Sequence, residues 1–413
     1  MKTSSASNTT SNTLLDDSAL ATCPACGLLC DDIKISSLSP LKVADTCSKS
    51  VAFFEQPVVT TQAQIAGKAA SLEDAIQRAV EILNGSQQVL FAGLGTEVHG
   101  MRAVLDLAEK TGATLEHMHA ASSLRNTLAL QQGGWQTTTL TEIKNRADLI
   151  IAVGTDIVSS HPRFLEKLVN NEHNLFDKPK PEVIYLGAED PEKLPEKLNL
   201  LNALANGSLK NTGGNNLDYA ALNNIIEKIK TAKYAVLVWS ASKLDFPYAE
   251  LTIQSIVRLI NRLNESTRVA GLPLNSGDGD TSVNNACTWR TGYTANIRFV
   301  GKPNVSTDAQ SVEYLAGKYS FEQALEQADA LLWISTFNAT PVPDSKLPTI
   351  VIGHPNSVFS SPPEVFIPVG IPGLDHIGTM FRLDSAVSLP LKQVRNSGLP
   401  KLANVLRQIR EAL

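Results

Sequence analysis

The chain has 413 residues, beyond the length at which one hydrophobic core stops growing, so we expect two or three lobes. Hydrophobic residues make up 43% and charged residues 19%, a balance typical of globular proteins that excludes a largely disordered chain. The net charge of −5 argues against a nucleic-acid partner, which would favour a basic face. No stretch approaches the roughly 20 apolar residues of a membrane span, so we expect no membrane partner either.

Residues 1–20 are rich in Ser, Thr and Asn and lack the basic and apolar regions of a secretion signal. They predict a disordered tail. Without a signal, the chain is expected to be cytoplasmic, where thiols stay reduced. Clustered cysteines are therefore expected to be ligands and not disulfides.

Four of the five cysteines fall within one short segment: Cys23, Cys26, Cys30 and Cys47. Thiolates at this spacing can converge on one 4Fe-4S cluster from a tight turn, with Gly27 easing the backbone. A four-cysteine zinc site is the main alternative, because zinc uses the same ligands. Unligated buried thiols are a third possibility.

After this segment, short apolar runs alternate with helical spacing, which predicts a parallel sheet covered on both faces and hence an α/β fold. Helical spacing predicts helices from residue 96 to Gly112, from Pro162, and near 249–263. Ligands of such sheets bind beyond the carboxyl ends of strands, here after Gly93, Gly154, Trp239 and Ser335. The predicted strands are 88–93, 113–119, 148–154, 182–187, 234–239, 268–272, 328–335, 349–353 and 364–370.

Two polar segments, 206–216 and 275–285, are expected to be linkers, because they are too rich in Gly, Asn, Asp and Ser for a core. The segment GLGTEVHG at 93–100 misses the third glycine of a dinucleotide fingerprint and predicts a plain strand-to-helix turn.

The segment GTDIVSSHPRF at 154–164 places polar residues at the end of a predicted strand. Asp156 or the serine pair at 159–160 can cap a helix, and Pro162 suits its first turn. His161 and Arg163 at the mouth of a strand suit an anion such as a pyrophosphate, with simple surface polarity as the alternative.

The segment CTWRTGYTANIRF at 287–299 follows the second predicted linker. Arg290 and Tyr293 on such an irregular segment could line a pocket, although a plain surface role is favoured. Cys287 stands apart from the other cysteines and predicts a core thiol.

These segments together resemble the molybdopterin oxidoreductases, and specifically the B subunit of formylmethanofuran dehydrogenase. The resemblance runs from about residue 22 to about residue 391. It rests on CPACGLLCDDI with the later Cys47, on TEIKNRADLIIAVGTDIVSSHPRF, on WRTGY and on EVFIPVGIPGLDHIGTMFRLDS.

The resemblance implies that the four cysteines hold a 4Fe-4S cluster and that α/β lobes hold a bis-pterin molybdenum or tungsten centre. It implies a Cys-rich subdomain at 21–60, a discontinuous lobe at 61–120 plus 235–395, and an inserted lobe at 121–234. A C-terminal helix at 396–413 follows, and the fourth domain of the superfamily is expected in a separate subunit.

The chain departs from this family in the segment after residue 119. Dehydrogenases of this type carry there a Cys or selenocysteine, followed by His, whose thiolate or selenolate ligates the metal. Here the residues are Ala120, Ala121, Ser122, Ser123, Leu124 and Arg125. A serine oxygen could replace the thiolate, but a hard alkoxide is an unusual fit, and helix capping by these serines is favoured.

That departure matches the related formyltransferase/hydrolase complex of methylotrophs, which releases formate from a formylated C1 carrier without redox chemistry. The resemblance then implies a scaffold subunit with amidohydrolase-like, C and formyltransferase partners. Molybdopterin or tungstopterin is expected to be absent, and Ser122, Ser123, His161, Arg163, Arg290 and Tyr293 would line a vestigial pterin pocket. The alternative is an active molybdenum or tungsten oxidoreductase subunit, favoured by the retained cysteines.

Overall fold

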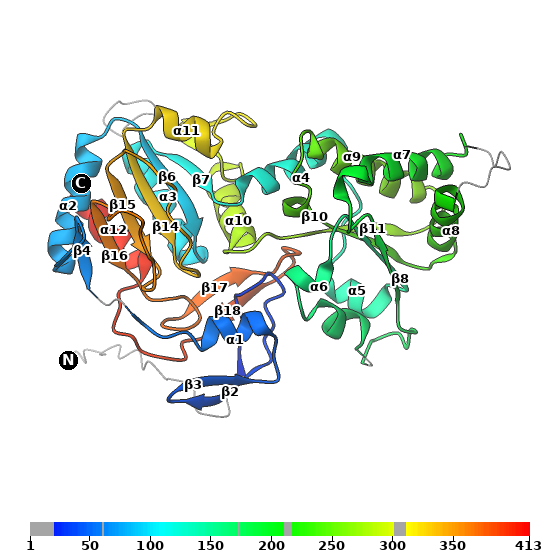
Figure 1. Ribbon diagram of the computed structural model, residues 1–413, viewed down its shortest axis with the longest axis horizontal. Coiled ribbons are helices and arrows are strands. Elements are labelled where there is room, and N and C mark those ends of the chain that lie inside the picture. Colours follow the sequence, from blue (N-terminus) through cyan, green and yellow to red (C-terminus); the bar gives the residue numbers. More distant parts are fainter. Residues whose placement is uncertain (1–19, 60–61, 172, 210–216, 301–310) are drawn as a thin grey trace, which may run out of the picture.

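The computed structural model describes residues 20–59, 62–171, 173–209, 217–300 and 311–413. The predicted tail at 1–20 lies outside these residues except for Leu20, and so does most of the predicted linker at 206–216. Two α/β lobes stand side by side, each built on its own sheet, and a small antiparallel sheet lies below the gap between them (Figure 1). The lobes are named below the large-sheet lobe and the small-sheet lobe.

The large-sheet lobe contains nine strands in the order β13-β12-β7-β6-β14-β15-β16-β4-β5. The five strands from β7 to β16 are parallel, and the outer pairs are antiparallel, so the sheet is mixed and not purely parallel as predicted. The strands are β4 (Ala63–Ile65), β5 (Lys68–Ala70), β6 (Val89–Gly95), β7 (Thr114–His117), β12 (Ile297–Val300), β13 (Ser311–Tyr314), β14 (Ala330–Ser335), β15 (Thr349–Gly353) and β16 (Val365–Pro368).

Helices cover both faces of this sheet because its central strands are apolar on both sides. One face packs against α2 (Leu72–Gly85), α3 (Val98–Thr111), α10 (Asp280–Thr291) and α12 (Leu402–Ala412), and the other against α11 (Phe321–Gln327). The predicted C-terminal helix is therefore α12, and it packs within this lobe against α3.

The small-sheet lobe contains four parallel strands in the order β11-β10-β8-β9. They are β8 (Leu149–Val153), β9 (Glu182–Leu186), β10 (Ala235–Ser240) and β11 (Val269–Leu274). One face carries α4 (Ala120–Gly133), α7 (Leu194–Ala205), α8 (Leu217–Thr231) and α9 (Ala249–Leu263). The other face carries α5 (Leu140–Arg146), α6 (Ile157–Ser160) and a π-helical turn, η1 (Leu165–Val169).

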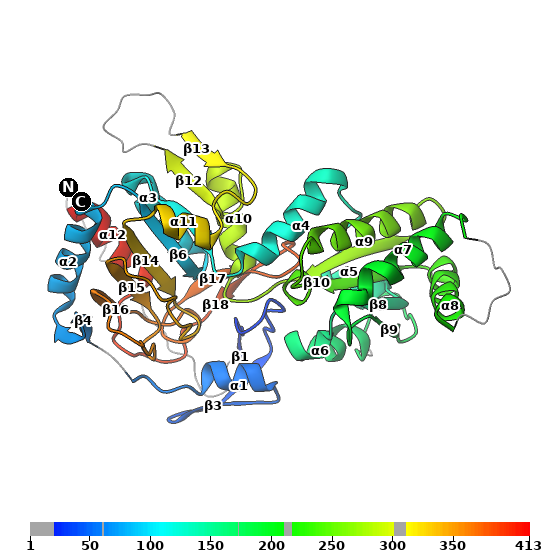
Figure 2. The same ribbon diagram turned by 45° about the horizontal axis from the view of Figure 1, so that its top comes forward.

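The expected boundary of the inserted lobe at residue 234 is wrong. The strands β10 and β11 lie beyond that residue, yet they pair with β8 and complete its sheet. The chain leaves the large-sheet lobe through α4, which lies between the lobes (Figure 2), and returns after β11. Helical and strand periodicity alone did not show which sheet these two strands join.

The N-terminal segment forms the small sheet β1-β2-β3 and one helix. It packs through Phe53, Phe54 and Leu29 against the segment around the β17-β18 hairpin. Its elements and the hairpin are β1 (Leu20–Ala21), β2 (Ile33–Leu38), β3 (Leu41–Ala44), α1 (Ser48–Phe54), β17 (Gly378–Phe381) and β18 (Ser388–Leu391). Short 3-10 turns, η2 (Pro191–Lys193) and η3 (Ala241–Lys243), complete the fold.

Local sequence accounts for the turns around the two predicted motifs. Glu97 caps α3 by accepting hydrogen bonds from the backbone N–H groups of His99 and Gly100, and α3 ends at Gly112 with φ 69°, where glycine relieves left-handed strain. GLGTEVHG is thus the plain turn that was predicted. Asp156 caps α6, also as predicted, but Pro162 follows this short helix and does not begin one.

The second predicted linker is also wrong. Residues 280–285 belong to α10, and Asp280 and Ser282 are 4% and 0% exposed. The segment is polar because its side chains bond one another and the neighbouring lobe, and not because it faces solvent. No helix among the described residues is long and apolar enough to cross a membrane.

Candidate functional site

The four clustered cysteines line one small cavity together with Thr46, Lys49, Ser50 and Arg163. Cys23, Cys26 and Cys30 come from the loop between β1 and β2, and Cys47 immediately precedes α1. The loop is tight, because the N–H of Cys23 donates to the carbonyl of Cys30 at 2.9 Å. The long interval before Cys47 is spanned by the β2-β3 hairpin, which brings this thiol back to the others.

The thiols of the loop lie in an apolar environment. Burial raises the pKa of Cys23 and of Cys30 to about 12, and burial also raises the pKa of Cys26. The free thiols are therefore neutral at pH 7, and ionising them requires a compensating positive charge. A bound metal supplies such a charge, because a coordinating thiol is deprotonated outright.

Arg163 forms one wall of the cavity but its charge is already compensated. Its guanidinium donates to both carboxylate oxygens of Asp32 at 2.8 Å and to Glu166, and Lys167 also contacts Asp32. Burial alone would raise the pKa of Asp32, but these cations lower it to about 2. Arg163 therefore fixes the β1-β2 loop to the small-sheet lobe.

Two buried hydroxyls face the cavity. The Thr46 hydroxyl has no hydrogen-bond partner among the described residues. The Ser50 hydroxyl has only the Cys23 thiol beside it, and this contact lowers the pKa of Cys23 against the larger effect of burial. A buried unpaired donor is costly, so a sulfur-rich group bound in the cavity would satisfy both hydroxyls. Thiolates are the ligands of iron-sulfur clusters, so the residue types at the cavity suit such a group. Their arrangement is not that of a preformed metal site, because within the described part of the chain no three His, Cys, Asp or Glu side chains are arranged to hold a metal ion.

A second group of polar residues lies where the two lobes meet, beyond the carboxyl ends of β7 and β11. His119 follows β7, and its Nε2 lies 3.0 Å from Oδ2 of Asp278, which follows β11 in the other sheet. The backbone N–H of His119 donates to Nδ1 of His117 at 3.0 Å, and Asn338 donates to Asp278. The polar loop predicted to be a linker is thus the bridge between the lobes.

Burial and charge oppose each other at this bridge. Burial lowers the pKa of His117, which is 1% exposed. Burial would also lower the pKa of His119, but its hydrogen bond to Asp278 raises it above the ordinary value. The hydrogen bond to Asp278 therefore favours the charged form of His119, whereas burial favours the neutral form of His117. His119 and Asp278 pair with each other within the chain.

The two serines predicted for a vestigial pocket lie in the first turn of α4. Ser122 Oγ donates to the carbonyl of His119 and lies 2.8 Å from Ser276 Oγ, and Ser123 Oγ accepts from Asn284 at 3.3 Å. The N-cap is His119 and has no side-chain cap, so the predicted capping by these serines is wrong. Ser122 instead ties α4 to the loop after β11.

His161 lies between the cysteine cavity and the bridge. Its Nε2 is 2.8 Å from Oδ1 of Asn275, and its Nδ1 is 3.0 Å from the Ser160 hydroxyl. Burial lowers its pKa to about 4, so the ring is neutral at pH 7. With His161 neutral and Arg163 compensated by carboxylates, these two residues offer little net positive charge to the anion that the sequence suggested.

Arg290 and Tyr293 lie apart from these groups. Arg290 is on the last turn of α10 and pairs with Glu109 of α3, and Tyr293 stacks on Tyr314 with ring centroids 4.9 Å apart. The prediction of an irregular segment is wrong, because residues up to 291 are helical and Gly292 ends the helix. Cys287 is fully buried in the core, as predicted.

Sequence reasoning missed His117, His119, Asn275, Asp278 and Asp280. The available signal was their position at or shortly after the carboxyl ends of apolar strands, which is where ligands and polar contacts gather in such sheets. The polar composition of residues 275–280 pointed instead to an exposed loop.

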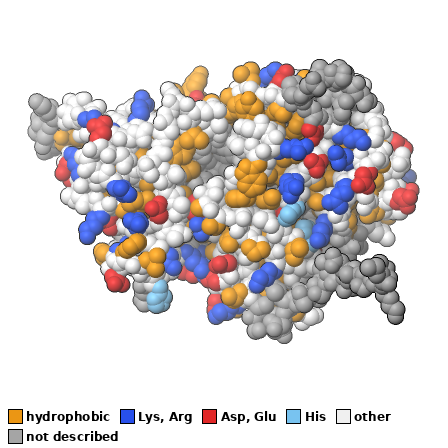
Figure 3. All heavy atoms as spheres, turned by 180° about the vertical axis from the view of Figure 1, so that it is seen from behind, with side chains coloured by type: hydrophobic (Ala, Val, Ile, Leu, Met, Phe, Trp, Pro, Cys, Tyr) orange, Lys and Arg blue, Asp and Glu red, His pale blue; other side chains and the backbone are white. Residues whose placement is uncertain are grey.

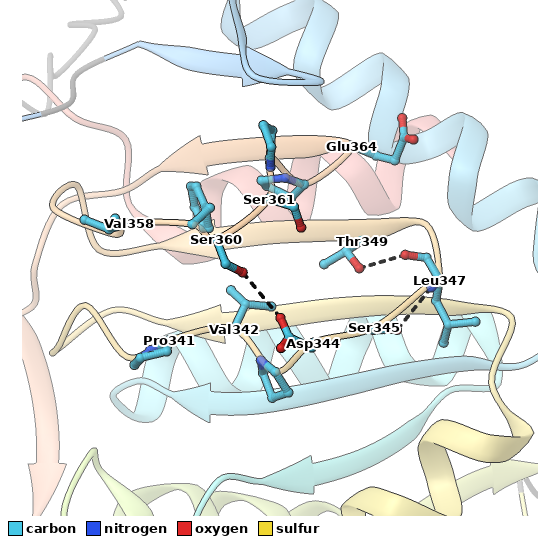
Figure 4. A pocket seen from close by; sticks show the side chains of 14 residues that line it. Pro341, Val342, Asp344, Ser345, Leu347, Thr349, Val358, Ser360, Ser361 and Glu364 are labelled. Atoms are coloured by element: carbon cyan, nitrogen blue, oxygen red, sulfur yellow. Dashed lines mark hydrogen bonds between the residues drawn. The ribbon is translucent and has the colours of Figure 1, made fainter.

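Two further concave sites lie outside these groups, and the second of them adjoins the cysteine loop. One is bounded by two proline-rich loops beside β15, where the Ser360 hydroxyl donates to Asp344 (Figure 4). Another, of about 640 Å³, opens next to Cys30 and is lined by Lys144, Lys167 and Leu175. The face opposite to Figure 1 mixes Lys and Arg with Asp and Glu and has no continuous basic patch (Figure 3).

The chain is similar to two kinds of C1 enzyme subunit. It is 29% identical over 333 residues to the B subunit of the formyltransferase/hydrolase complex Fhc of Methylorubrum extorquens, covering 75% of this chain and 85% of that protein. It is 24% identical to the B subunits of tungsten-containing formylmethanofuran dehydrogenase 2 from Methanocaldococcus jannaschii and from Methanococcus maripaludis, each covering 90% of this chain and 92% of the relative. No family model matches.

The comparison of folds also finds a formyltransferase/hydrolase complex. A chain in the crystal structure of the formyltransferase/hydrolase complex FhcABCD from Methylorubrum extorquens, solved with methylofuran, matches with a TM-score of 0.71 and 25% identity. The match covers 85% of this chain and 98% of that one. The chain therefore has an α/β fold like that found in these complexes. Its similarity to their B subunits confirms the resemblance predicted from the sequence.

Proposed function

We propose that the chain is the B subunit of a formyltransferase/hydrolase complex that releases formate from a formylated C1 carrier, and that it is a non-redox scaffold within it. Its partners are the amidohydrolase-like A subunit, the C subunit and the formyltransferase subunit. Support comes from the higher identity to the formyltransferase/hydrolase subunit than to the two dehydrogenase subunits. The carrier is of the tetrahydromethanopterin or methanofuran type.

One observation carries the non-redox proposal: residues 120–125 offer no thiolate where the dehydrogenases place their metal ligand. The most suitable substitute is Ser122. Its hydroxyl donates a hydrogen bond to the His119 carbonyl and also contacts the Ser276 hydroxyl. An alkoxide ligand would have to give up both contacts and would be a hard donor in place of a soft one. The molybdopterin-oxidoreductase lobes are thus proposed to serve as an assembly framework.

The cysteines are proposed to hold a 4Fe-4S cluster that stabilises the fold. Its ligands would be Cys23, Cys26, Cys30 and Cys47, and the unpaired Thr46 hydroxyl at the cavity supports such a bound group. When bound, the cluster supplies one-electron chemistry, but in a complex without a pterin metal its effect is to tie the β1-β2 loop to the start of α1. Structural metal sites contribute folding energy in this way.

Metal analysis of the purified complex tests the proposal. We expect iron without stoichiometric molybdenum or tungsten, formate release from the formylated carrier, and background reduction of an artificial electron acceptor. Molybdenum or tungsten at one equivalent per copy of this chain would contradict the scaffold proposal.

The second candidate is an active oxidoreductase subunit of a formylmethanofuran dehydrogenase. It is favoured by the similarity to the two dehydrogenase subunits, which covers more of the chain, and by the four cysteines. It predicts a bound pterin and formate-dependent reduction of the acceptor. Carrier hydrolysis with acceptor reduction at background would exclude it.

A further inference from the structure

We propose that residues 14–17, which read Leu-Leu-Asp-Asp, bind back into a groove between α3, α12 and the β17-β18 hairpin. The two leucines would fill the apolar part of the groove, and the two aspartates would pair with Lys392 and Lys401. The groove lies outside the cysteine cavity and the bridge, so the inference does not depend on the function proposed above.

The groove is concave and mostly apolar. It has a volume of about 640 Å³ and opens where the starts of α3 and α12 meet the hairpin. Buried Pro372, Leu391 and Leu402 line it, together with Ile377, which is 63% exposed. A large exposed apolar side chain beside an apolar hollow of this size is typical of a binding site.

The groove also carries positive charge that the described residues do not neutralise. The ammonium group of Lys392 donates to the backbone carbonyl of Leu20 at 2.9 Å, and neither Lys392 nor Lys401 pairs with a carboxylate of the described residues. The carboxylate of Glu97, which also lines the groove, already accepts three backbone hydrogen bonds. The groove therefore suits a segment that combines apolar side chains with acidic ones.

The chain's own N-terminal segment has that chemistry and begins at the right place. Leu20, which Lys392 contacts at the groove, follows residues 14–17 by three to six positions. Six extended residues span at most about 20 Å, so the run can reach the groove. Because the tether is short, the effective concentration of the run at the groove is high, and contacts that are weak between separate molecules are sufficient.

Cleavage of the purified complex by a protease that cuts before aspartate tests the proposal. Docking should protect the bonds before the two aspartates. Reversing the charge of the groove with Lys392→Glu and Lys401→Glu should speed cleavage about tenfold, because cleavage follows the population of undocked segment. Leu14→Ser with Leu15→Ser should speed it as well, since the segment then loses its apolar contacts.

Lys233→Glu with Lys243→Glu is the matched control. Both lysines are exposed and lie near the two ends of β10 in the small-sheet lobe, so this variant should be cleaved at the unchanged rate. Equal cleavage rates in the unchanged complex and in the groove variant would overturn the proposal.

Cross-linking with a carbodiimide, followed by mass spectrometry, identifies the occupant of the groove directly. The reagent joins carboxylates to ammonium groups that are in contact, so we expect links between the two aspartates and the two groove lysines. Links from these lysines to another subunit of the complex, in place of the chain's own aspartates, would also overturn the proposal.

Discussion

The cysteine cavity and the bridge between the lobes differ in how far their buried polar groups are hydrogen-bonded. At the bridge, Ser122, His119 and Asp278 are all hydrogen-bonded to other residues of the chain. At the cavity, the Thr46 hydroxyl is unpaired, the Ser50 hydroxyl has only a thiol beside it, and three thiols are neutral because of burial. Since buried polar groups are ordinarily satisfied, the cavity has the features of a site that a bound group completes, and the bridge those of a completed structural contact.

The largest effect is expected from removing a ligand at the cavity. Cys26→Ser should reduce the iron content and destabilise the loaded protein by on the order of 3 kcal/mol or more, because metal binding contributes folding energy. Thermal unfolding and iron analysis measure both. Cys287→Ser is the control. This buried core thiol lies outside the cavity, so the iron content of the variant protein should stay normal. Normal iron in Cys26→Ser would show that Cys26 is not a ligand.

His161 joins the two regions and makes stability depend on pH. Its pKa is about 4 in the fold and about 6.5 when unfolded, so the unfolded chain binds more protons between these values. Stability should fall as the pH drops from 6.5 to 4, with this residue contributing up to about 1.4 kcal/mol per pH unit. In chemical denaturation, His161→Gln should flatten the profile, whereas exposed His173→Gln should not. An unchanged slope in His161→Gln would contradict a neutral buried ring.

Asp32 tests how firmly the cavity is attached to the small-sheet lobe. Asp32→Asn removes the carboxylate that accepts two hydrogen bonds from buried Arg163, but Glu166 remains, and Asp32 is partly exposed. We expect a loss of roughly 1–2 kcal/mol in unfolding free energy. Because the pKa of Asp32 is lowered to about 2, its contribution is present above pH 4 and is lost as the pH falls towards 2.

The neighbouring Asp31 provides the control for that experiment. It is exposed, and Asp31→Asn should change stability by less than about 0.5 kcal/mol. Equal losses in the two variants would mean that negative charge near the cysteines, and not the pairing with Arg163, stabilises the loop.

The smallest effect is expected at the bridge. Ser122→Ala removes the hydrogen bonds to His119 and Ser276 and should cost about 1 kcal/mol in unfolding free energy. Formate release by the assembled complex should not change, because the serine is proposed to be structural. Ser123→Ala, which loses one longer contact, should cost less. Loss of turnover in assembled Ser122→Ala would reopen a catalytic role for this position.

Local signals in the chain predicted much of the fold. Apolar runs bounded by glycine or polar residues located β6, β8, β10 and β15, and helical spacing predicted α9 over 249–263, the bounds that the structure has. The cysteine spacing and the absence of a thiol at 120–125 are also properties of the sequence alone. These features depend on neighbours in the chain, so periodicity and residue type are sufficient to find them.

Tertiary structure decided the features that depend on distant partners. Pairing places β10 and β11 beside β8, although they lie on the other side of the predicted boundary. Residues 275–280 have the composition of an exposed loop, but His119, which follows β7, and Ser122 of α4 supply hydrogen bonds that allow their partial burial. The four thiols share a cavity because the β2-β3 hairpin brings Cys47 back to them. A polar group can be buried at little cost only with a partner, and which partner arrives is a long-range property of the fold.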